Sequence, residues 1–127
     1  MSVTPYLTIP GGRGAEAADF YASVFHGTQE RRSPAQDGKR LMHCQIHFAG
    51  GAVFLSDDFR GTPGAPAFSS VHVGLEKAAD VDAVAAKAKA AGATIAMGPE
   101  DAFWGDRFVM FVDPFGHTWQ VGAPKDK

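Results

Sequence analysis

The first half of the chain combines one helical pattern with several β-type patterns. β-branched and aromatic residues predict a strand over residues 3–9, and Pro5 places that strand near a sheet edge or at a strand start. Apolar side chains recur at helical spacing over residues 15–25, and Gly27 is the expected helix stop. Period-two alternation and β-type composition predict three further strands, at 28–33, 41–48 and 52–58.

The second half repeats this order of elements. A strand is predicted over residues 69–76, followed by an alanine-rich helix over 79–91 that Gly92 closes. Three strands then follow, at 94–97, 107–112 and 117–122. Each half therefore has the order βαβββ, and GKRLM at 38–42 is echoed by GDRFV at 105–109. We predict an α+β fold, a single domain of two modules at about residues 1–60 and 67–123.

Composition narrows the classes of partner. The 127 residues are 45% hydrophobic, which suits one globular domain, and the net charge of −2 without a basic cluster argues against nucleic acid as a partner. No apolar run approaches the roughly 20 residues of a membrane span, so no membrane partner is expected. Cys44 is the single cysteine, and the first residues lack a signal-peptide pattern, so we expect a cytoplasmic protein.

The sequence DPFGH, residues 113–117, predicts a tight hairpin turn. Asp113, Pro114 and Gly116 occupy the positions that a type I turn followed by a left-handed residue requires. His117 then either begins the next strand or takes part in chemistry. We favour the structural role, because alternation places His117 on the same face as Trp119 and Val121.

Three stretches of the sequence resemble one known superfamily. They are PYLTIPG with AADFYASVF, LMHCQIHFAGGAVFLSDDF, and FWGDRFVMFVDPFGHTW. The chain is similar to the vicinal oxygen chelate superfamily, which includes glyoxalase I, bleomycin-resistance proteins and extradiol dioxygenases, and more closely to its PhnB-like branch. The resemblance implies two modules forming a curved mixed sheet around a cavity, a bound small organic molecule, and a homodimer.

Alternation along the strands divides their residues into two faces. We expect the helix-packed face to carry Leu7, Ile9, Met42, Cys44, Ile46, Phe48, Val71, Val73, Trp119 and Val121. The opposite face carries Thr, His, Gln and Ser rather than the Lys and Glu of most bare sheet surfaces, which favours a polar cavity over a merely solvated face. With Asp57 and the loop residue Trp104 added, the candidate ligand-binding residues are Thr4, Tyr6, Thr8, His43, Gln45, His47, Asp57, Ser70, His72, Trp104, Thr118 and Gln120.

The resemblance also identifies where a metal would bind. In metal-using members the four ligands come from the first and fourth strands of each module, and the matching positions here fall near Thr4, Leu55, Ser70 and Gln120. Such side chains are poor ligands for a transition metal. A one-residue shift at Leu55 would bring in Ser56 or Asp57, which still leaves fewer than the usual three or four ligands.

The histidines offer no better metal site. His43 and His47 are separated by roughly 13 Å along one strand, too far to share an ion. His43 with His72 would make only a weak site. We therefore expect no cofactor, with a divalent metal as the lower-ranking alternative. A histidine here could act as an acid or base, but we favour one that only orients a ligand.

The leading functional prediction is a small-molecule-binding protein without a tightly bound metal. The alternative is a metal-dependent lyase, isomerase or dioxygenase of the glyoxalase type, and no catalytic residue is assigned. A third version is a scaffold dimer whose cavity has lost its ligand. Trp104 is expected to cover one end of the cavity or to pack over the last hairpin, and Cys44 to fill the core rather than act as a nucleophile.

Overall fold

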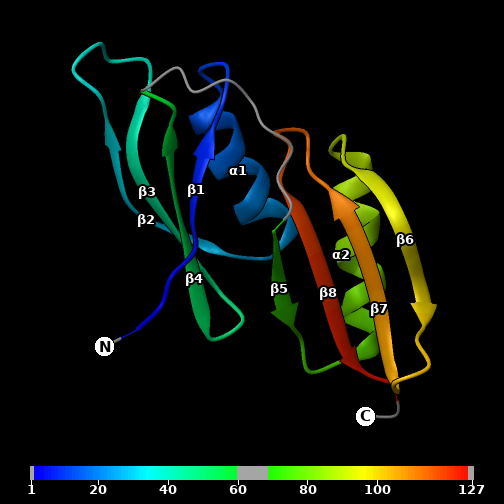
Figure 1. Cartoon of the computed structure of the whole chain (residues 1–127). Helices are drawn as coiled ribbons and strands as arrows, with labels where there is room; N and C mark the ends of the chain where they lie inside the picture. Colours follow the sequence, from blue (N-terminus) through cyan, green and yellow to red (C-terminus); the bar gives the residue numbers. More distant parts are fainter. Residues whose placement is uncertain (1, 60–68, 126–127) are drawn as a thin grey trace. The chain divides into compact units, whose positions relative to one another are not determined.

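The computed structural model describes residues 2–59 and 69–125, and each of these two ranges belongs to its own compact unit (Figure 1). The elements of the first module are β1 (Tyr6–Ile9), α1 (Gly14–Val24), β2 (Thr28–Pro34), β3 (Leu41–Phe48) and β4 (Gly51–Asp57). Those of the second are β5 (Ser70–Gly74), α2 (Ala78–Ala90), β6 (Thr94–Asp101), β7 (Asp106–Val112) and β8 (Thr118–Pro124). The predicted α+β fold of two βαβββ modules is confirmed.

Each module contains one four-stranded mixed sheet, and the two sheets have the same topology. The strand order is β1-β4-β3-β2 in the first and β5-β8-β7-β6 in the second. The first strand of each module pairs in parallel with the last, and the other pairs are antiparallel. Each sheet is an open one with two edges, so the curved sheet closed around a cavity remains a prediction.

A helix covers one face of each sheet. In the first module α1 packs on the sheet with Ala17, Tyr21 and Val24, against strand residues that include Ile46 and Leu55. In the second module α2 packs on β6, β7 and β8. We call the other side of each sheet its helix-free face. The helices have 11 and 13 residues, and no helix of the described ranges is long and apolar enough to cross a membrane.

The end of α1 differs from the prediction in one detail. The residue with a left-handed backbone is His26, at φ 57°, rather than Gly27. The Gly27 N–H donates to the Ala22 carbonyl at 2.9 Å, which closes the helix in a Schellman-like turn. Glycine is needed at 27 for space, because a Cβ there would lie 2.8 Å from the Ile46 Cγ2 atom.

The start of β3 reverses the expected orientation of two residues. Leu41 is 3% exposed and Met42 is 48% exposed, so the assignment of Met42 to the helix-packed face was wrong. The cause is an irregularity in the pairing with β2, where Ser33 lies opposite His43 but the next residue, Pro34, lies opposite Leu41. Met42 is therefore an extra residue at a bulge, and alternation cannot be carried across it.

The DPFGH sequence forms the predicted hairpin turn, with a left-handed Gly116 at φ 96°. Asp113 is buried, and its carboxylate accepts hydrogen bonds from the backbone N–H groups of Phe115 and His117, at 2.9 and 3.0 Å, and from Trp119 Nε1 at 2.8 Å. The Asp113 N–H donates to the His117 carbonyl at 2.8 Å. His117 thus closes the β7–β8 hairpin through its backbone.

Candidate functional site

Five side chains on the helix-free face of the first module form a continuous line, which we call the polar row: Tyr6, His43, Gln45, His47 and Glu30. Tyr6 Oη lies 3.2 Å from His43 Nδ1, and His43 Nε2 lies 3.2 Å from Gln45 Nε2. At the other end of the amide, Gln45 Oε1 lies 3.0 Å from His47 Nε2. Glu30 Oε2 completes the row at 3.6 Å from His47 Nε2.

Strand geometry assembles this row. Period-two alternation points His43, Gln45 and His47 of β3 to one face. The pairing of β2 with β3 places Glu30 directly opposite Gln45. On the other side, Phe54 of β4 lies opposite both Gln45 and Tyr6, which brings β1 within reach of β3. Sequence reasoning missed Glu30, because the register that pairs it with Gln45 is not visible in the sequence.

The rings of Tyr6 and His43 in the polar row form an aromatic cluster with Phe54. The Tyr6 and His43 ring centroids are 5.8 Å apart, and Phe54 meets both edge-on at 6.3 and 5.2 Å. These separations lie within the range of favourable ring contacts. The face therefore combines flat apolar surface with fixed hydrogen-bonding groups, the composition typical of small-molecule sites.

An open groove of about 660 Å³ adjoins the row at His47. Its lining comes from the N-terminal segment and from the β3–β4 hairpin: Ser2, Val3, Thr4, His47, Phe48, Gly50, Gly51, Ala52 and Phe54. The volume falls within the ~300–1,000 Å³ of ligand pockets. Phe54 contacts Tyr6 and His43 of the polar row and also lines the groove, so groove and row form one continuous surface within the first module.

The second module presents a smaller polar group on its own helix-free face. The parallel register of β5 and β8 places Ser70 opposite Thr118 and His72 opposite Gln120. Gln120 Nε2 donates to Ser70 Oγ at 2.9 Å. Across the sheet from Gln120, its partner on β7 is Met110, and the partner of Met110 on β6 is Met97, which is exposed. This face is thus less polar than that of the first module.

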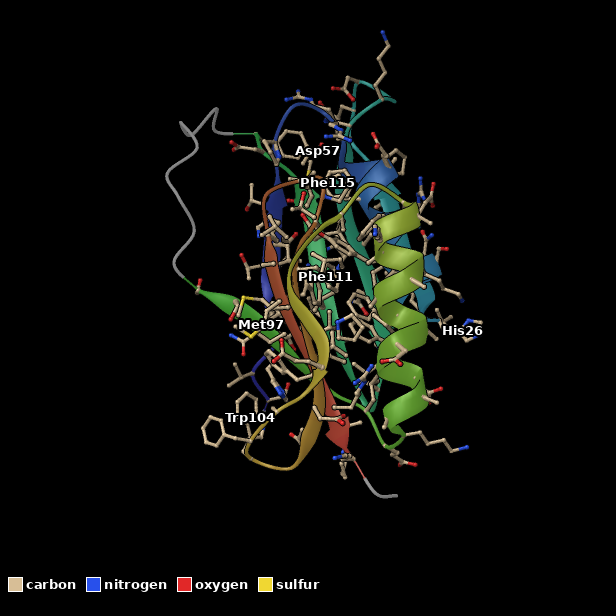
Figure 2. All side chains as sticks on the ribbon, turned by 90° about the vertical axis from the view of Figure 1, so that its right-hand side faces the viewer. His26, Asp57, Met97, Trp104, Phe111 and Phe115 are labelled. Carbon is tan, nitrogen blue, oxygen red and sulfur yellow. The ribbon has the colours of Figure 1, made fainter. Side chains whose placement is uncertain are left out.

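Trp104 packs over β7, one of the two positions expected for it. Its ring lies 5.3 Å from the ring of Phe108, and Phe103 meets it edge-on at 5.0 Å. Met97 and Trp104 extend away from α2, whereas Phe111 lies between the sheet and the helix (Figure 2). Trp104 therefore shares the helix-free side of its sheet with Gln120.

Asp57 does not lie with the other candidate residues. Its side chain is on the helix-packed face and is only 2% exposed. The carboxylate accepts hydrogen bonds from the Gly14 N–H at 2.7 Å and from the Leu41 N–H at 2.6 Å. It thereby ties the first turn of α1 to the start of β3, and the expectation of a ligand-binding role for Asp57 is corrected to a structural one.

The residues of the first module do not fit a transition metal. Leu55, the position matched to a metal ligand, is fully buried on the helix-packed face, and its neighbours on the other face are Phe54 and Ser56. His43 Nε2 and His47 Nε2 are both engaged by Gln45. Within residues 2–59 and 69–125, no three His, Cys, Asp or Glu side chains come together as a metal ion would require.

Cys44 lies in the core of the first module, fully buried beneath the polar row. Burial raises the pKa of its thiol, because the thiolate loses hydration there. The side chain fills space in the core, in agreement with the expected apolar role.

Two modules of this topology, each with a helix on one face of its sheet and polar groups on the other, define the glyoxalase class of fold. The chain belongs to the Glyoxalase/Bleomycin resistance protein/Dioxygenase superfamily, whose family model matches residues 4–121. The resemblance seen in the sequence is thereby confirmed.

Individual relatives agree with this assignment. Uncharacterized protein Mb0911c of Mycobacterium bovis is 35% identical, over 97% of this chain and 83% of its own length. The crystal structure of protein PA1353 from Pseudomonas aeruginosa is 25% identical, with a TM-score of 0.84 and 99% of both chains covered. A PhnB protein from Bacillus cereus has the same fold, with 21% identity, a TM-score of 0.77, and coverage of 97% of this chain and 99% of its own.

Proposed function

We propose that the protein binds a small organic molecule on the helix-free face of its first module, without a tightly bound metal. The observation that carries the proposal is the polar row, in which neighbouring side chains hold one another in place before any ligand arrives. Preorganised groups need not be ordered on binding, which improves affinity. The adjoining groove and the Phe54 ring supply apolar contact area.

A thermal-shift screen of small aromatic and polar molecules tests this proposal. A ligand at one hundred times its Kd should stabilise the protein by about 2.7 kcal/mol. His43→Ala should weaken the binding of that ligand, because the substitution interrupts the polar row between Tyr6 and Gln45. His26→Asn is the matched control, since His26 is an exposed histidine just after α1. Equal affinity in the wild type and His43→Ala would refute this site.

Metal content is measured on the same preparations by plasma mass spectrometry, with melting curves in added Ni, Co, Mn, Zn and Fe. We expect no stoichiometric metal and no shift, because the donor set of the first module lacks the ligands a transition metal requires. Stoichiometric metal with a shift would instead support the metal-dependent lyase, isomerase or dioxygenase.

The proposed binding protein acts as a homodimer in the cytoplasm. Family resemblance motivates the dimer, and the exposed side chains of Met97, Phe103 and Trp104 provide apolar surface for it. Light scattering should give twice the 13.4 kDa chain mass, and a monomeric mass would refute the dimer. A single cysteine that is buried suits a reducing compartment, which cell fractionation can check.

A further inference from the structure

The polar row can hold its hydrogen bonds in two opposite directions. The Gln45 amide has one accepting and one donating end, and each end meets a histidine nitrogen. If the oxygen faces His47, that Nε2 must donate and His43 Nε2 must accept. If the amide is turned over, both roles are reversed. The orientation of one amide therefore determines the tautomers of both histidines.

Glu30 selects between the two directions. Its carboxylate only accepts hydrogen bonds, and its negative charge lies 3.6 Å from His47 Nε2. A hydrogen on that nitrogen is attracted by Glu30, whereas a lone pair there would be repelled. The Gln45 oxygen consequently faces His47, and its NH₂ group faces His43, as the structure has them.

The selected direction ends at the hydroxyl of Tyr6. Because His43 Nε2 accepts from Gln45, the hydrogen of neutral His43 is on Nδ1, where it donates to Tyr6 Oη. The hydroxyl hydrogen of Tyr6 is then not used within the row. Tyr6 is 51% exposed, so this hydrogen is available to a bound molecule.

From this we infer that Glu30, acting through His47, Gln45 and His43, fixes the Tyr6 hydroxyl as a donor to an acceptor oxygen of the ligand. The inference rests on the proposed binding site and adds the ligand's chemistry. The ligands of this site carry a carbonyl or carboxylate oxygen on a flat group, which can lie against one of the two perpendicular rings of Tyr6 and Phe54 and meet the edge of the other. In this arrangement Tyr6 is a specificity-determining residue and Glu30 is a positioning residue.

The direction of the row is tested without any ligand by long-range ¹H–¹⁵N spectra of the histidine rings. The spectra are recorded near pH 8, above the range in which histidine ordinarily titrates. We expect His43 to carry its hydrogen on Nδ1 and His47 on Nε2. Hydrogen on Nε2 of His43 in the wild type would overturn the inference.

A charge reversal tests the part played by Glu30. In Glu30→Lys an ammonium donor replaces the carboxylate, so His47 Nε2 should become an acceptor and the hydrogen of His43 should move to Nε2. Glu76→Lys makes the same charge change at an exposed position of the second module, and should leave both tautomers as they are. A His43 tautomer that Glu30→Lys leaves unchanged would contradict the role of Glu30.

The ligand chemistry is tested with two probes of the same shape. Benzoate offers only acceptors and benzamidine only donors, and both are flat. Tyr6→Phe should raise the Kd of benzoate about 3- to 10-fold, as the loss of one hydrogen bond does, and should not change that of benzamidine. Equal benzoate binding by wild type and Tyr6→Phe would overturn the role of Tyr6, and failure of the wild type to bind benzoate would overturn the ligand class.

These outcomes are separate from the failure of the proposed function. If the broad screen finds ligands but benzoate does not bind, only the inferred chemistry is wrong. If the screen finds no ligand at all, the proposed binding function fails. The histidine spectra then still show whether Glu30 sets the direction of the row.

Discussion

Replacing Asp57 with alanine should destabilise the first module strongly. The carboxylate is 2% exposed and satisfies two backbone donors, the N–H groups of Gly14 and Leu41. Alanine leaves both donors without this partner in a buried environment. Each unsatisfied donor costs about 1–3 kcal/mol, so the expected loss in the free energy of unfolding is about 2–6 kcal/mol. Urea denaturation followed by circular dichroism measures this loss.

Asp82→Ala provides the matched control. Asp82 also accepts two hydrogen bonds, both from Arg107, at 2.9 and 3.2 Å. Its side chain is 50% exposed, so water can replace the lost partner. If hydrogen-bond number alone determined the effect, the two substitutions would be equally harmful. A loss for Asp57→Ala no larger than that for Asp82→Ala would refute the argument from burial.

Three further predictions concern other positions. His26→Gly should stabilise the protein by about 0.5–1 kcal/mol in the same urea assay, because glycine adopts φ 57° without strain, and a loss would contradict this reading. Trp119→Phe should cost about 1.5–3 kcal/mol by the same measurement, since Asp113 Oδ2 loses its 2.8 Å donor, and an unchanged midpoint would refute that role. Cys44 should react with iodoacetamide at pH 8 far more slowly in the native protein than in the urea-unfolded chain, because its raised pKa lowers the thiolate fraction and burial blocks access of the reagent. Equal rates in the two states would refute this expectation.

The order of elements could be predicted from the sequence because it depends on local periodicity. Alternation along β3 from His43 to His47 is regular, and it placed three members of the polar row correctly on one face. It failed at Met42, where a bulge inserts one residue and reverses the orientation of the residues before it. A bulge of this kind depends on the partner strand and leaves no mark in the pattern of β3 itself.

The position of Leu55 could not be fixed for a related reason. A motif match counts residues along the chain, whereas the face a residue occupies depends on the pleat of its strand. One residue of error exchanges Leu55 for Phe54 or Ser56 and reverses the conclusion about its face. Asp57 likewise required the structure, because its two donors lie 43 and 16 residues away in the sequence.

The two modules show why the site depends on side chains more than on topology. Both sheets have the same strand order and the same parallel pair at one edge. In the first module the helix-free face carries a hydrogen-bonded row from Tyr6 to Glu30, whereas the corresponding face of the second includes Met97 and Met110. A shared scaffold therefore supports two different surfaces, and the function follows from the residues that each surface presents.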